Sequence, residues 1–217
     1  MPVLEATAPM QVWTWDITEL PGPFQSVTYH LYVAMDLFSR QIVASRIEDR
    51  EDKKLARDMF TAAFAHYGAH PTVVHSDGGA SMMSETMADL YSRLGITRSR
   101  SRPGVSNDNP FSEAGHKTLK YWHAAPRHFT SIEHARTWFT TVIDAYNTTH
   151  HHTGLAGHTP ASVHDGTWKH IHTARQHTLD QLYRANPARY HTPPTAQAPY
   201  ARVGINTKKT KDRLTTD

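Results

Sequence analysis

The segment QVWTWDIT, residues 11–18, is the stretch from which the fold can be worked out. Trp13, Trp15 and Ile17 share one side of an extended chain, and we expect the two tryptophans in a core. Asp16 lies on the other, more polar side. This alternation predicts a β-strand with a carboxylate in its middle. A buried, unpaired carboxylate is unfavourable, so Asp16 should have a salt-bridge or capping partner, or bind a metal ion.

The segments that follow predict a mixed sheet with helices on its faces. Two β-rich runs come directly after the first strand and suggest an antiparallel meander, and helical and extended segments then alternate. The expected strands are residues 11–18, 27–36, 41–47, 72–75 and 96–99, and the expected helices are residues 51–67, 83–94, 110–121 and 131–147. This order predicts an α/β fold with a mixed five-stranded sheet.

Composition divides the chain into three parts. Residues 1–10 carry two prolines and no periodicity, and they predict an arm or linker. Residues 11–165 form the predicted core, and residues 166–217 a less regular C-terminal extension, with a helix near 168–183 and a loosely held, proline-rich tail. The basic residues of this tail are Lys208, Lys209, Lys211 and Arg213.

The overall composition excludes several classes of protein. The 217 residues include no cysteine, so disulfides and thiolate metal sites are excluded. No run of about 18 to 20 apolar residues and no secretory pattern occurs, and we expect a cytoplasmic, nucleoid-associated protein without a membrane partner. The net charge of +3 and the pI of about 9.1 point mildly to a polyanionic partner.

A second acid, Asp77, follows the expected strand 72–75 in the sequence HSDGG. The crossover helix 51–67 can return the chain so that strands 11–18 and 72–75 are neighbours. Asp16 and Asp77 could then face one cleft. Asp77 before two glycines also fits an ordinary turn aspartate, and we assign Asp36, in the hairpin sequence DLFSR, to turn structure.

A third acid lies in SRPGVSNDNPFSEAGHKTLK, residues 101–120. Asn109 fits a helix N-cap and Pro110 the first helical position, which places Glu113 in the first turn. Lys117 and Lys120 share its helix face, so the three could also be a solvated Glu–Lys surface cluster. Brought together, three carboxylates without cysteine select Mg²⁺ or Mn²⁺, and two such ions suit phosphoryl transfer.

The motifs WTWDIT, HSDGG and SRPGVSNDNPFSEAGHKTLKYW together resemble the catalytic core of DDE-type insertion-sequence transposases. These are similar to retroviral integrases and share the ribonuclease H-like fold. Residues 78 to 112 separate Asp77 from Glu113, which matches the family's spacing of 35 residues. The resemblance covers about residues 8–160. It implies that Asp16, Asp77 and Glu113 bind two Mg²⁺ ions.

The resemblance also implies a reaction and partners. A metal-bound water cuts a transposon end, and the freed 3′-hydroxyl attacks target DNA in a homo-oligomer that joins two ends. Lys117 and Lys120 match lysines that approach DNA phosphates. The family's helix-turn-helix segment does not precede this core, so end recognition would need a separate subunit or a missing N-terminal segment.

The sequence departs from the family pattern directly after Glu113. Gly115 and His116 stand where the family usually has larger, aromatic residues. A glycine inside a helix costs about 1 kcal/mol against alanine, and we expect weaker packing beneath Glu113. This motivates an alternative hypothesis, a catalytically inactive DNA-binding remnant. A ribonuclease H-type nuclease is a third option, which the 35-residue spacing disfavours.

Two further groups of side chains have more than one interpretation. Arg98, Arg100 and Arg102 alternate with serines and could form a phosphate-binding edge, or simply a charged edge strand that deters aggregation. The histidines at 150–152 and 158 suggest a loop, because adjacent histidines on an extended chain point to opposite sides. Contact with DNA is their second option.

Overall fold

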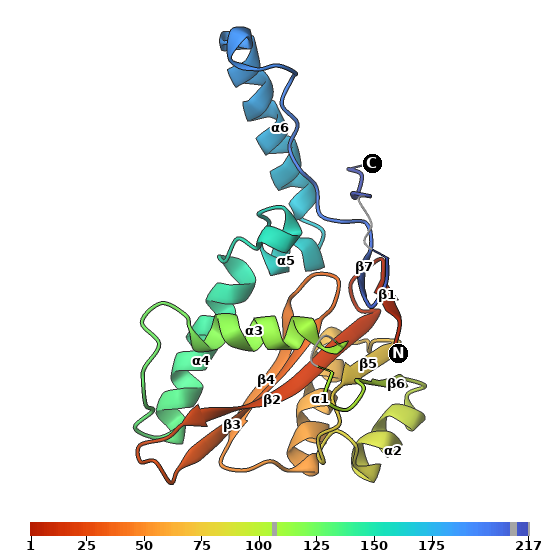
Figure 1. Cartoon of the computed structure of the whole chain (residues 1–217), viewed down its shortest axis with the longest axis vertical. Coiled ribbons are helices and arrows are strands. Elements are labelled where there is room, and N and C mark those ends of the chain that lie inside the picture. The colour runs from red at the N-terminus through yellow and green to blue at the C-terminus, as the bar shows by residue number, and fades with distance from the viewer. Residues whose placement is uncertain (106–107, 209–211, 217) are drawn as a thin grey trace.

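The computed structural model describes residues 1–105, 108–208 and 212–216. Its central sheet has five strands in the order β4-β3-β2-β5-β6 (Figure 1). The strands are β2 (Val12–Pro21), β3 (Thr28–Asp36), β4 (Ile42–Glu48), β5 (Val73–Ser76) and β6 (Thr97–Arg100). The first three are antiparallel, and β5 and β6 are added in parallel. The predicted α/β class and meander are confirmed, and each strand begins one residue later than predicted.

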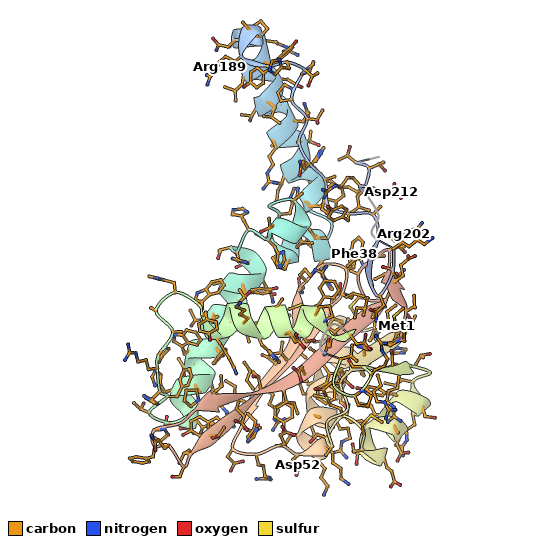
Figure 2. All side chains as sticks on the ribbon, viewed as in Figure 1. Met1, Phe38, Asp52, Arg189, Arg202 and Asp212 are labelled. Carbon is orange, nitrogen blue, oxygen red and sulfur yellow. The ribbon has the colours of Figure 1, made fainter. Side chains whose placement is uncertain are left out.

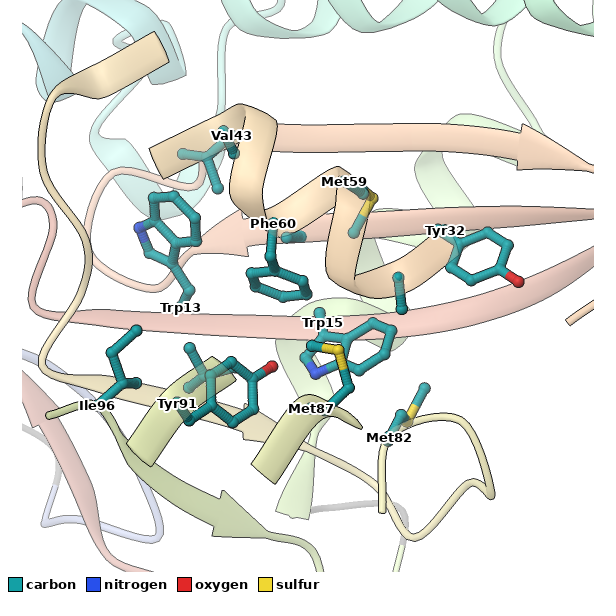
Figure 3. Close-up of a cluster of buried hydrophobic side chains, with 14 residues drawn as sticks. Trp13, Trp15, Tyr32, Val43, Met59, Phe60, Met82, Met87, Tyr91 and Ile96 are labelled. Carbon is teal, nitrogen blue, oxygen red and sulfur yellow. The ribbon is translucent and has the colours of Figure 1, made fainter. Parts of the chain in front are cut away.

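One face of the sheet is covered by α1 (Lys53–Tyr67) and α2 (Glu85–Arg93). Trp13 and Trp15 are fully buried there, and Trp15 meets Phe60 edge-on with ring centroids 5.3 Å apart (Figure 3). The Asp52 carboxylate caps α1 by accepting a hydrogen bond from the Lys54 N–H. The alternation of residues 11–18 therefore identified the core side of β2 correctly.

The other face is covered by α3 (Pro110–Lys120) and α4 (Ile132–Thr148). Pro110 begins α3 as predicted, but Asn109 forms no side-chain capping hydrogen bond. The hairpin between β3 and β4 is held by Asp36, whose Oδ1 accepts hydrogen bonds from the N–H groups of Phe38 and Ser39. This confirms the structural role predicted for Asp36.

Gly115 lies where α3 packs closely against the sheet. A Cβ atom at this position would lie 2.6 Å from the Cε of Met35 on β3, which is closer than real contacts allow. The space that a larger side chain would need is therefore already filled by Met35. The predicted weak packing beneath Glu113 is wrong, because a glycine here lets the helix and the strand meet directly.

The C-terminal part comprises a 3₁₀ turn η2 (Thr153–Leu155), α5 (Pro160–His164), α6 (Trp168–Ala185), η3 (Pro187–Arg189) and β7 (Val203–Ile205). Helix α6 extends away from the sheet, and the chain returns beside it (Figure 1). Gln176 fixes the returning segment, because its side chain accepts from the Ala196 N–H at 2.8 Å and donates to the Pro194 carbonyl at 3.2 Å.

The two ends of the chain meet in a second, two-stranded sheet. Strand β1 (Leu4–Ala6) pairs antiparallel with β7, and Ala6 and Ile205 are buried. Strand pairing holds residues 4–6 of the predicted arm and residues 203–205 of the tail, which the sequence predicted to be loosely held. Lys209 and Lys211 of the predicted basic tail lie outside the described residues. Within the described part of the chain, no helix is long and apolar enough to cross a membrane.

Candidate active site

A cavity of about 490 Å³ has all three predicted carboxylates in its lining. Asp16 comes from the middle of β2, and Asp77 follows β5 directly. Trp15 pairs with Ser76 in the parallel ladder, so the next residue of each strand is one of the two acids. Glu113 reaches the cavity from the first turn of α3. The structure thus brings the three acids to one cavity, as the sequence predicted.

The three carboxylates line this cavity but are not close enough together to surround one ion. In residues 1–105, 108–208 and 212–216, no group of three or more His, Asp or Glu side chains is close enough to hold a metal ion. Glu113 is exposed, whereas Asp16 and Asp77 are partly buried. Burial raises the pKa of Asp77, the hydrogen bond from the Gly79 N–H opposes this shift, and the charge of Asp16 adds to it. Two neighbouring acids of this kind favour a cation between them.

His116 contacts the first acid directly, which sequence reasoning missed. Its Nδ1 lies 3.3 Å from Oδ2 of Asp16, and its ring is buried. One turn earlier, the Ser112 hydroxyl donates to Thr14 Oγ1 at 3.1 Å. Residues four apart on α3 therefore meet residues two apart on β2, and these contacts fix the helix along the strand. The only signal in the sequence was this matched spacing.

A buried polar cluster supports the wall of the cavity behind Asp77. His75 is fully buried, with Nδ1 2.9 Å from Ser99 Oγ and Nε2 2.8 Å from the Asp108 carbonyl. Burial lowers the pKa of His75, so this imidazole stays neutral at pH 7. No sequence pattern singled out His75 or Asp108.

The Asp108 carboxylate is the centre of a charged pair. It accepts two hydrogen bonds from the Arg102 guanidinium, at 2.8 and 3.0 Å, and one from the Arg102 N–H. These hydrogen bonds from Arg102 lower the pKa of Asp108 far below its usual range. Arg102 lines the cavity, but its charge is already paired with Asp108. Its main contact in this structure therefore joins residue 102 to residue 108.

The other predicted DNA-contacting residues are exposed outside the cavity. Arg98 and Arg100 lie on the edge strand β6, and Lys117 and Lys120 on α3. This placement agrees with contact to a DNA backbone and equally with a charged surface, so their roles stay predictions.

The histidines that follow α4 have local partners. His151 Nδ1 lies 2.9 Å from the Gly157 carbonyl, and His152 Nδ1 accepts from the Gly154 N–H at 3.1 Å. His158 packs edge-on against Trp168. The loop interpretation is supported.

Comparisons with known proteins place this site in a family context. Two family profiles, both described as integrase core domain, match residues 6–106 and 94–160. A transposase of insertion sequence element IS904 from Lactococcus lactis is 35% identical over 155 residues, which are 70% of this chain and 60% of that protein. This chain covers 60%, 58% and 30% of the lengths of the three insertion-sequence relatives that match.

Solved structures share the fold at lower sequence identity. The simian T-cell lymphotropic virus intasome in complex with a PP2A regulatory subunit gives a TM-score of 0.62 at 21% identity, over 73% of this chain and 55% of that one. The HTLV-2 integrase catalytic core in complex with magnesium gives 0.55 at 16% identity, over 72% and 97%. Both show the same ribonuclease H-like arrangement of sheet and helices.

Proposed function

Because the chain belongs to the integrase core family, we propose that it catalyses metal-dependent DNA cleavage and strand transfer during transposition of an insertion sequence. The observation that carries this proposal is the single cavity lined by Asp16, Asp77 and Glu113, with the family's spacing between the last two. The 35% identity to an insertion-sequence transposase supports the same substrate class.

The residues of the cavity fit a site for Mg²⁺ or Mn²⁺. Their donors are carboxylate oxygens, which these hard cations prefer, and two of the acids are neighbours on adjacent strands. An integrase core of the same fold was solved with magnesium, which supports this choice. Two bound ions would stabilise the charge that develops on the attacking and leaving oxygens of a phosphodiester.

The protein contributes the orientation of the acids. Asp16 is held by its contact with His116 and by the N–H of Ile17, which donates to Oδ1 at 2.8 Å. Asp77 accepts from the Gly79 N–H at 3.0 Å. Glu113 enters the same cavity from the first turn of α3, a helix that packs on β2 and β3. We place a homo-oligomer on DNA, with end recognition supplied by another segment or subunit.

Nicking of DNA tests this proposal. The purified protein is incubated with supercoiled plasmid, and with DNA carrying transposon ends together with a supplied end-recognition segment, in Mg²⁺ or Mn²⁺. Nicked or joined products should form with these ions and disappear with Asp77→Asn, while DNA binding persists. Binding that is unaffected by metal, by Asp77→Asn and without any product would instead identify an inactive DNA-binding remnant.

A further inference from the structure

A second cavity, of about 480 Å³, also adjoins the first turn of α3, since Phe111 belongs to its lining. The β3–β4 turn provides one side of this cavity and the C-terminal segment provides another. The principal lining residues are Arg40, Phe111, Tyr200, Arg202, Asn206 and Lys208. The described residues of the lining include three cationic side chains and no Asp or Glu, and one of the three, Arg202, is ion-paired with Glu5 outside the lining.

Arg40 is the unusual member of this lining, because its guanidinium is buried and, among the described residues, forms no ion pair, although the charge of Asp36 acts on it. It is only 7% exposed, and its guanidinium carbon lies 3.6 Å from the centroid of the Phe111 ring. Its Nη1 has no hydrogen-bond partner, and no carboxylate pairs with it, in the described part of the chain. Burial lowers the pKa of Arg40 to about 10, which leaves it cationic at neutral pH. A buried charge without a direct partner is costly, the charge of Asp36 compensates for it in part, and an anion in the cavity would add to this.

The backbone of Arg40 is held by the β3–β4 turn. Its φ of 63° lies in the left-handed region, which arginine rarely adopts. The turn holds this conformation through the Arg40 N–H, which donates to the Asp36 carbonyl at 2.9 Å. A left-handed residue is common in hairpin loops, so this geometry fixes the turn that carries Arg40.

The C-terminal wall of the cavity is built into the fold rather than loosely apposed. Arg202, at the end of the sheet where β1 and β7 lie (Figure 2), forms an ion pair with Glu5 at 3.3 Å. Asn206 Nδ2 donates to Asp108 Oδ1 at 2.8 Å. Asp108 also binds Arg102, which lines the first cavity. This first cavity, with Asp16, Asp77 and Glu113 in its lining, is called the acidic cavity. The two cavities therefore share one buried carboxylate as their common support.

We propose that this basic cavity binds a phosphate group of the DNA backbone, on the strand that passes the neighbouring acidic cavity. Guanidinium groups suit phosphate because their N–H donors match its oxygens in pairs. The inference rests on the proposed function, since it assumes that DNA lies across the start of α3. It adds a binding site that is separate from the three acids. This site is formed by Arg40 and by residues near the C-terminus.

Binding of DNA without divalent metal tests this inference separately from catalysis. Affinity for a fluorescein-labelled duplex of random sequence is measured by anisotropy over a series of salt concentrations. Arg202→Gln combined with Lys208→Gln should weaken binding about tenfold and make the slope of log K against log salt shallower by about 1. Arg40→Gln should do the same, and Arg40→Lys should restore part of the affinity. Arg202 and Lys208 lie at the rim of the cavity, and the variant that replaces both is called the rim variant. It keeps the test informative if Arg40→Gln fails to fold.

Controls distinguish the source of the phosphate and the failure of each proposal. Lys54→Gln, an exposed residue on α1 across the sheet, removes one charge outside both cavities and should leave the slope unchanged. Equal slopes for the rim variant and this control would overturn the inference, whatever the nicking assay shows. Loss of thermal stabilisation by inorganic phosphate in the rim variant, with DNA affinity intact, would overturn it in favour of a free anion. A changed slope in a protein that never nicks DNA would support the basic cavity while contradicting the proposed reaction.

Discussion

The acidic and the basic cavity are almost equal in volume, about 490 and 480 Å³, and differ in charge. Both adjoin the first turn of α3, where Glu113 lines the first and Phe111 the second. The acidic cavity is built from the middle of β2, the end of β5, the segment after β6 and the start of α3, and the basic one from a hairpin turn, the start of α3 and the C-terminal segment. The difference suggests a division of labour, with metal ions and chemistry on one side of the helix start and DNA backbone on the other.

Removal of one acid should separate these two roles with the largest effect. Asp16→Asn should lower the rate of metal-dependent nicking by at least about a thousandfold, because a neutral amide is a poor ligand for Mg²⁺. DNA affinity without metal should stay equal or increase, since a negative charge beside the DNA is removed. Rate and dissociation constant are measured on the same preparation. An equal loss in both would mean that the acidic cavity mainly binds DNA.

Removal of the Asp108 carboxylate should give the next largest effect, because both cavities depend on it. Asp108→Ala leaves Arg102 and Asn206 without their common acceptor, and it should lower the melting temperature by several degrees. DNA affinity and nicking should both fall in the folded fraction. Asp58→Ala, an exposed acid on α1 that also pairs with an arginine, is the matched control. Loss of only one activity would show that the cavities are supported independently.

The packing of α3 against the sheet can be tested at Gly115. Gly115→Leu should destabilise the protein by about 2 kcal/mol, because the added side chain has no space against Met35. Gly115→Ala should change stability by less than about 1 kcal/mol, because better helix propensity offsets a contact that the flexible end of Met35 can relieve. Unfolding in urea measures both. A stabilising Gly115→Leu would mean that there is an unfilled gap beneath Glu113 after all.

The acidic cavity could be predicted largely from the sequence, because its information is local. Alternation identified β2 and its acid, a strand followed by glycines identified Asp77, and a proline fixed the start of α3. The contact of His116 with Asp16 could not be predicted, since it depends on how far α3 is shifted along β2. Residues 114–116 looked like a defect because a sequence does not show that Met35 fills the space.

The basic cavity could not be predicted for a different reason. Strands β1 and β7 have three residues each, too few for a detectable alternation, and they pair across almost the whole chain. Residues 37–40 do form the predicted hairpin turn, but nothing local reveals that Arg40 packs over Phe111. Sites made by contacts between distant segments require the tertiary structure, even when each turn is predicted correctly.

The smallest expected effect is the part of the pH response that His152 contributes beside the basic cavity. His152 accepts from the N–H of Gly154, a residue that lines the basic cavity. Burial lowers the pKa of His152 to about 4, and the charges of Arg40 and His150 contribute. The unfolded state therefore binds more protons between about pH 6.5 and 4, so stability should decline as the pH falls through this window.

A non-titrating replacement isolates this response. His152→Asn keeps a hydrogen-bond acceptor without a proton to gain, so its melting temperature should fall less than that of the parent between pH 7 and 5, by a few degrees. His123→Asn, at an exposed position between α3 and α4, should change nothing. Because the charge of Arg40 acts on His152, an anion bound at Arg40 should weaken this response. The difference in melting temperature between the parent and His152→Asn should therefore be larger without inorganic phosphate than with it. Identical pH curves for the parent and His152→Asn would show that the loop beside the basic cavity gains no stability from the neutral imidazole.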